Sequence, residues 1–91
     1  MRTINYRRYK VASTWRRSST TMGGYAVEYA DLADKRTGTI YNNGAARVVN
    51  DDGETVNAKG EPSPRTVFAG ETAWMSAESV MRDAAFAARF V

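Results

Sequence analysis

Residues 25–49 read YAVEYADLADKRTGTIYNNGAARVV, and apolar and polar side chains alternate along their first part. In YAVEYADL, Tyr25, Val27 and Tyr29 fall on one face, whereas Ala26 and Glu28 fall on the other. This period of two residues is typical of a β-strand. ADKRTG is typical of a turn, and TIY of a short return strand. NNG (42–44) predicts a hairpin, because Asn and Gly tolerate the positive φ of a tight turn, and ARVV predicts the strand that follows it.

Downstream, Asp52-Gly53 predicts a second hairpin that leads into ETVNA. KGEPSP (59–64) is expected to be a loop, since its two prolines cannot donate hydrogen bonds within a central sheet. RTVFAG predicts a last short strand.

Upstream, INYRRYKVASTWRR (4–17) predicts a long basic strand. Tyr9, Val11, Ser13 and Trp15 share one face, and Arg8, Lys10, Ala12, Thr14 and Arg16 share the other. Residues 4–16 would extend for about 43 Å, which exceeds the diameter of about 30 Å expected for a globule of this size. Ile4 and Tyr6 are also out of phase, so we expect a bulge at Arg7-Arg8 that returns both to the core. SSTTMGG (18–24) is expected to be a flexible loop.

From Thr72 to Phe90 the apolar period becomes helical, and Trp74, Ala77 and Met81 begin its apolar stripe. The expected fold is therefore α+β: an antiparallel sheet of four to five strands, within residues 3–69, packed by one C-terminal helix over 72–90. Met75, Phe86 and Phe90 lie away from the stripe. They either pack under loops or form an exposed apolar patch that marks a contact site.

The length of 91 residues predicts a single domain, 1–91. The chain contains no cysteine, which favours a reducing compartment. No apolar stretch reaches the length of a membrane span, and no signal peptide is evident. A cytoplasmic protein is therefore expected.

The net charge of +3 is distributed unevenly along the chain. Residues 1–27 contain six basic residues and no acid, whereas residues 28–91 contain seven basic and ten acidic residues. A positive face would favour an anionic partner. Alternatively, the two halves neutralise each other across the sheet.

The usual machinery of catalysis is missing from the sequence. Without His and Cys, the common general bases, thiol nucleophiles and transition-metal ligands are absent. No SxxK, GxSxG, GxGxxG or P-loop spacing occurs. A calcium loop centred on Gly53 would place Lys59 where a glutamate is required. We therefore expect a protein that is not an enzyme and uses neither a cofactor nor a metal.

Binding is the remaining class of function, and the oligomeric state stays open. The expected site is a basic surface, with a possible contribution from the apolar patch: Arg7, Arg8, Lys10, Arg16 and Arg17, with Met75, Phe86 and Phe90. One hypothesis is direct contact with RNA or DNA, because arginine binds phosphate bidentately. The aromatic side chains of the basic strand, however, are expected to serve the core.

The second hypothesis is an inhibitor that docks on a host protein or ribonucleoprotein machine. In size, composition and expected architecture, the chain resembles small phage-encoded anti-CRISPR proteins, which are often single α+β domains without catalytic motifs. This resemblance implies a CRISPR surveillance complex as the target, with the basic strand blocking nucleic-acid recognition. Many such proteins are acidic mimics of DNA, and the charge of +3 departs from that pattern. A third hypothesis is a small structural or assembly protein.

Overall fold

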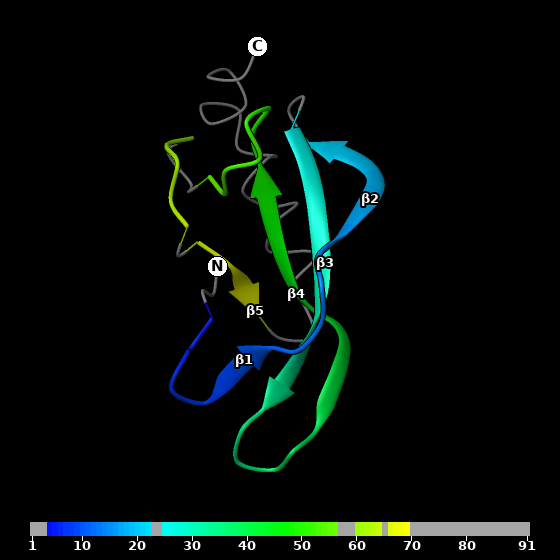
Figure 1. Cartoon of the computed structure of the whole chain (residues 1–91), viewed down its shortest axis with the longest axis vertical. Coiled ribbons are helices and arrows are strands. Elements are labelled where there is room, and N and C mark those ends of the chain that lie inside the picture. The colour runs from blue at the N-terminus through cyan, green and yellow to red at the C-terminus, as the bar shows by residue number, and fades with distance from the viewer. Residues whose placement is uncertain (1–3, 23–24, 57–59, 65, 70–91) are drawn as a thin grey trace.

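The computed structural model describes residues 4–22, 25–56, 60–64 and 66–69. These residues form a single antiparallel sheet built on a long central hairpin (Figure 1). The strands are β1 (Tyr9–Val11), β2 (Arg16–Met22), β3 (Tyr25–Asp34), β4 (Ile40–Val49) and β5 (Phe68–Ala69). β1 and β2 lie one after the other along one edge of β3, and β5 pairs with β4 on the opposite side of the hairpin.

The turn between β3 and β4 lies at residues 35–39, as ADKRTG predicted. Gly38 has a φ of 73°, and its N–H donates to the carbonyl of Asp34 over 2.8 Å. Glycine suits this position because it has no Cβ to oppose a left-handed backbone.

The hairpin predicted at NNG is wrong, because Asn42–Gly44 form a bulge inside β4. Ala30 pairs with Ala45, but Leu32 pairs with Tyr41, so β4 carries two more residues than β3 across this interval. The extra length is absorbed at Asn43, whose φ is 55°. The residue types that permit a tight turn also permit a bulge, and the longer-range pairing of β3 decided between the two.

Gly44 is required at this bulge for reasons of space. A Cβ added at Gly44 would lie 2.8 Å from Cβ of Tyr41 and 3.0 Å from Cβ of Leu32. Asp31, opposite the bulge, accepts a hydrogen bond from the N–H of Asn43 at Oδ1 over 3.2 Å. The bulge is therefore packed closely against Tyr41 and Leu32, and it is hydrogen-bonded to Asp31 of the neighbouring strand.

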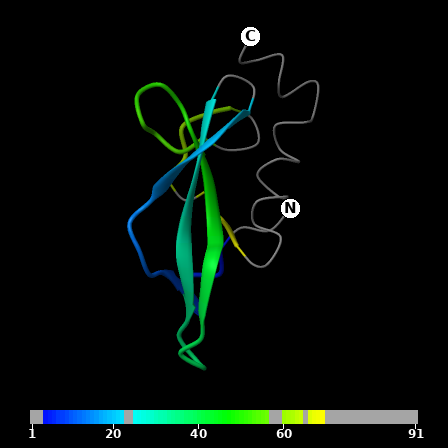
Figure 2. The same ribbon diagram turned by 90° about the vertical axis from the view of Figure 1, so that its right-hand side faces the viewer.

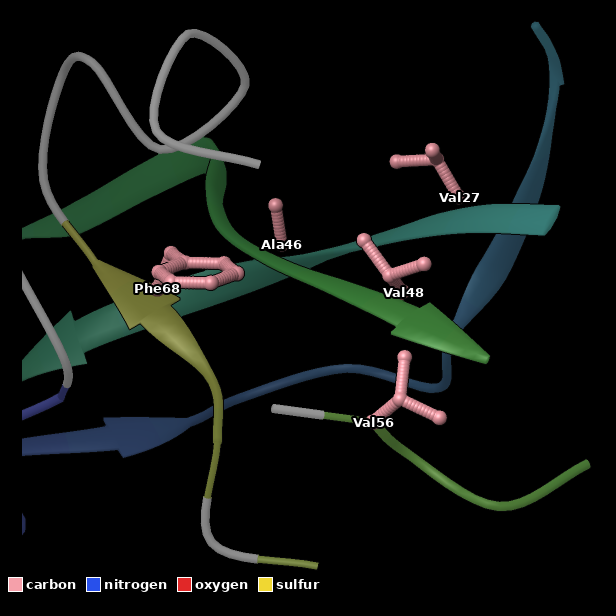
Figure 3. Packing of buried hydrophobic residues seen from close by; sticks show 5 residues of the cluster. All are labelled: Val27, Ala46, Val48, Val56 and Phe68. Carbon is pink, nitrogen blue, oxygen red and sulfur yellow. The ribbon is translucent and has the colours of Figure 1, made fainter. Parts of the chain in front are cut away.

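The sheet carries a buried apolar cluster on each face. One cluster contains Val27, Ala46, Val48, Val56 and Phe68 (Figure 3). The other contains Ile4, Leu32, Ala45, Val67 and Ala69, with Tyr9, Val11 and Trp15 packed against it. Since neighbouring residues of a strand point to opposite faces, the alternation along β3, β4 and β5 assigns the two clusters to opposite sides.

The predicted α+β class is wrong for the part of the chain that the structure describes, which is all-β and contains no helix. The sheet curls into an open half-barrel. The N–H of Ile4 donates to the carbonyl of Val67, beside β5, over 2.7 Å, whereas Tyr9 already lies on β3 at the other edge. The N-terminal side of this curl packs Tyr9, Val11 and Trp15 against the second cluster. The expected helix over 72–90 lies outside the described residues.

The basic N-terminal segment is shorter as a strand than expected. Residues 6–8 form a turn rather than the predicted bulge. Ile4 is buried, as predicted, but Tyr6 is exposed. The predicted alternation is confirmed further on, because Tyr9, Val11 and Trp15 pack on the core. The loop predicted at 18–24 is wrong for residues 18–22, which continue β2.

The structure confirms the turn predicted at Asp52-Gly53 and the last predicted strand. Gly53 has a φ of 81°, and its N–H donates to the carbonyl of Asn50, which forms the predicted turn. Thr55 then bridges back to Val49 at the end of β4. The last predicted strand is β5.

Candidate binding surface

An asparagine begins the N-terminal turn. The carbonyl of Asn5 accepts hydrogen bonds from the N–H groups of Arg8 and Tyr9, over 3.1 and 2.8 Å. Its side-chain Oδ1 accepts from the N–H of Arg7 over 3.1 Å. Asparagine favours turns because its side chain can bind the backbone two residues further on. This turn carries the chain from the β5 edge of the sheet to the β3 edge.

An ion pair clamps the N-terminal turn to the end of the β3–β4 hairpin. Nε and Nη2 of Arg8 donate to Oδ2 of Asp34 over 3.2 and 3.0 Å. Oδ1 of Asp34 accepts from the N–H of Arg36 over 2.8 Å. Two further bonds come from Lys35, whose N–H donates to the carbonyl of Arg8 and whose Nζ donates to the carbonyl of Tyr6, both over 2.7 Å.

The electrostatics follow from this clamp. The side chain of Asp34 is only 1% exposed, and the hydrogen bond from Arg8 lowers the pKa of its carboxyl group. The same interaction raises the pKa of the Arg8 guanidinium. Arg8 also lies over the ring of Tyr9, with 5.3 Å from Cζ to the ring centroid. The positive charge of Arg8 is therefore already paired with a carboxylate of the protein.

Arg16 and Arg17 are also paired with carboxylates of β3. Nη2 of Arg16 lies 2.8 Å from Oδ1 of Asp31, and it also donates to Oδ1 of Asn43 over 2.7 Å. Hydrogen bonding to Arg16 is the main cause of the lowered pKa of Asp31. Nη2 of Arg17 lies 3.6 Å from Oε2 of Glu28. These contacts are those expected if the two halves of the chain neutralise each other across the sheet.

A second arginine shares Glu28 with Arg17. Arg47 on β4 approaches Oε1 of Glu28 to 2.7 Å through Nη2. Its Cζ also lies 4.3 Å from the ring centroid of Trp15, which is within the range of a cation–π contact. Trp15 therefore packs between the core and a guanidinium, and it does not present a free face for a nucleic-acid base.

Two of the five expected cations remain available. Arg7 and Lys10 are exposed, and neither side chain has a partner among the described residues. Within the same part of the chain, the exposed side chain of Arg36 also has none. With the ammonium group of Lys35, these cations gather where the N-terminal turn meets the β3–β4 turn.

Large apolar side chains are exposed at the same end of the molecule. Tyr6 is 48%, Ile40 54% and Tyr41 37% exposed. Lys10, Ala33 and Ile40 form one row across β1, β3 and β4, so their side chains share a face. Tyr41 pairs with Leu32 and lies on the opposite face of β4. We give the name hairpin-tip surface to the other exposed residues at this end: Tyr6, Arg7, Lys10, Lys35, Arg36 and Ile40.

The hairpin-tip surface differs from the surface expected from the sequence. The structure brings Arg7 and Lys10 together with Lys35 and Arg36, but it places Arg16 and Arg17 along β2. The sequence reasoning missed Lys35, Arg36 and Ile40, although the adjacent cations of the KRTG turn were a usable signal. The expected apolar patch of Met75, Phe86 and Phe90 lies outside the described residues.

Comparison with protein-family models, with curated proteins and with solved structures finds no match to this chain. Within the described residues, no cluster of acidic side chains is suited to hold a metal ion. In the same part of the chain, no helix is long and apolar enough to cross a membrane.

Proposed function

We propose that this chain is a small non-enzymatic binding protein that docks on a nucleoprotein complex through its hairpin-tip surface. One observation carries the proposal: exposed cations and exposed large apolar side chains coincide at one end of the sheet. Residues 5–10 and 33–41 contain five cations and one carboxylate. That carboxylate, Asp34, forms an ion pair with Arg8. The remaining positive charge favours an anionic partner.

The resemblance to anti-CRISPR proteins makes a CRISPR surveillance complex the first partner to test. In this proposal the protein acts as an inhibitor in the host cytoplasm, and its tip occupies a surface needed for recognition of nucleic acid. The basic part of the contact is smaller than the sequence suggested, because Arg8, Arg16 and Arg17 are ion-paired.

The test measures the affinity of the full chain for a purified surveillance complex. Arg36→Gln removes one charge from the tip, and Arg17→Gln removes one exposed charge from β2 as a matched control. The ion pair of Arg17 is long, the Arg17 side chain is 63% exposed, and Glu28 keeps Arg47 as its partner, so the loss of this pair should cost only about 0–1 kcal/mol of stability. We expect Arg36→Gln to weaken binding severalfold and Arg17→Gln to leave it unchanged. Equal effects, or no binding by the natural chain, would reject the proposal.

A second candidate function is direct binding of single-stranded nucleic acid, and the free cations of the tip favour it. Such binding weakens steeply with salt, with a logarithmic slope of about −0.7 for each phosphate contact. A titration with a short single-stranded RNA at several salt concentrations therefore tests it. Binding that is flat in salt, or absent, would exclude it.

A further inference from the structure

We propose that the hairpin-tip surface recognises an acidic protein surface with an apolar pocket, and that Ile40 is the side chain that enters the pocket. This inference rests on the proposed function and names the part of the nucleoprotein that is contacted: its protein, not its nucleic acid.

The distribution of free charge argues against a phosphate backbone as the partner. Proteins that bind single strands without sequence preference line a groove with cations that follow successive phosphates, and they stack bases on aromatic rings. Here the cations along the N-terminal segment and β2 are interrupted by carboxylates, because Asp34, Asp31 and Glu28 each hold an arginine. What remains is a compact cluster at one end.

The apolar part of the surface favours a protein partner. Ile40 is 54% exposed and lies in one row with Lys10 and with Ala33, which is 5% exposed. A branched aliphatic side chain gains nothing from a phosphate, but it is stabilised when an apolar pocket removes it from water. Protein interfaces combine an apolar, desolvated core with a polar rim, and a few residues contribute most of the binding free energy.

The rim of this surface has one sign of charge. Arg7, Lys10 and Arg36 have no side-chain partner among the described residues. Carboxylates are the complementary groups on a protein, and arginine pairs with them bidentately. An acidic rim around an apolar pocket therefore fits the row of Lys10, Ala33 and Ile40 better than a uniform line of phosphates does.

The test is a nuclear magnetic resonance titration of the full isotope-labelled chain with three defined probes. The first is a synthetic peptide of glutamates flanking leucines, the second has serines in place of the leucines, and the third is a short single-stranded RNA. We expect the leucine peptide to shift the amide signals of Lys10, Ala33 and Ile40 and to bind severalfold more tightly than either other probe.

Two variants complete the experiment. Ile40→Thr keeps a β-branched residue in the strand but removes the apolar end, and we expect it to abolish the preference for leucine. Thr21→Ser, at an exposed position of β2, is the matched control and should keep the preference. If RNA binds at the tip more tightly than the leucine peptide, or if Ile40→Thr keeps the preference, the inference is overturned.

The two proposals fail in different ways. A chain that binds the surveillance complex but prefers RNA at its tip would retain the proposed function and lose this inference. A chain that prefers the leucine peptide but does not bind the surveillance complex would lose that partner and retain the inference.

Discussion

Gly44 carries a hydrogen atom at the position where every other residue type carries Cβ. Because that carbon would lie 2.8 Å from Cβ of Tyr41, Gly44→Ala forces the bulge to shift. We expect a loss of about 1–3 kcal/mol in the free energy of unfolding, as in other overpacked sites, measured by urea denaturation. Asn42→Ala, an exposed neighbour, is the control and should stay within about 0.5 kcal/mol. Equal stability of the Gly44 variant and the natural chain would show that the bulge yields freely.

Asp34 gives the stability of the protein a defined dependence on pH. Its pKa is lowered in the folded state by Arg8, so the folded state binds the proton less readily than the unfolded state does. The stabilisation is therefore complete above the unfolded pKa of about 4 and is lost as the pH falls through the lower folded value. Urea denaturation between neutral and acid pH measures this loss.

Asp34→Asn separates this carboxylate from the others. We expect the variant to be less stable at neutral pH, with a shallower decline toward acid. Asp51→Asn, in the exposed turn at 50–54, is the control and should keep the natural profile. An unchanged acid slope in the Asp34 variant would contradict the role of the clamp.

The partner of each ion-paired arginine could not be predicted from the sequence. The alternation from Tyr9 to Trp15 predicted which side chains face the core, because it depends only on local geometry. The partner of Arg8 lies 26 residues away and that of Arg16 lies 15 away. Such pairing is decided by strand register, which no local pattern specifies.

At the scale of elements, local signals failed where two structures use the same residues. Asn-Gly permits a positive φ, and both a hairpin turn and a bulge need it. The pairing between β3 and β4 places Asn42–Gly44 inside a strand and leaves the turn to KRTG. Residues 18–22 look like a polar loop, but they belong to β2, which pairs with β3 on both sides of a register shift between Arg17 and Thr21.

The two apolar clusters on opposite faces of the sheet should respond independently to mutation. Leu32→Val shortens a side chain of one cluster and should cost about 1 kcal/mol, whereas Val48→Ala trims the other and should cost about 1.5–3 kcal/mol. Because the two sites share no partners within their clusters, we expect the losses to add within about 0.5 kcal/mol in the double variant. Urea denaturation of all three variants measures the sum.

A strong departure from additivity would show that the faces are coupled. The matched comparison is Val48→Ala with Val27→Ala, since both residues belong to one cluster. That pair should deviate from additivity, because neighbouring side chains relax into each other's space.

At the scale of the whole molecule, whose longest axis measures 41 Å, the two ends of the hairpin differ in charge among the described residues. The hairpin tip lies at one end, and the turn at 50–54, with exposed Asp51, Asp52 and Glu54, lies at the other (Figures 1 and 2). If the partner is acidic, this difference in charge would favour an approach with the hairpin tip first, which affects the rate of encounter more than the final contact.

The kinetics of binding should therefore divide between the two parts of the hairpin-tip surface. Lys10→Gln should slow association severalfold and reduce its dependence on salt, because rim charges act mainly on the rate of encounter. Ile40→Thr should leave association unchanged and speed dissociation, because packing acts mainly on residence time. Surface plasmon resonance against the surveillance complex measures both rates. The reverse assignment of the two variants would contradict it.

The hydrogen bond between Ile4 and Val67 has a consequence for the order in which the protein can be assembled. It joins residues that are 63 positions apart along the chain. On the ribosome the N-terminal segment is made early, but its partner beside β5 is made much later. Residues 25–49 can pair as a local hairpin as soon as they emerge, whereas Ile4 cannot pair until Val67 has been made. The edge of the sheet where Ile4 meets Val67 is therefore completed late, when the chain closes around a hairpin that already exists.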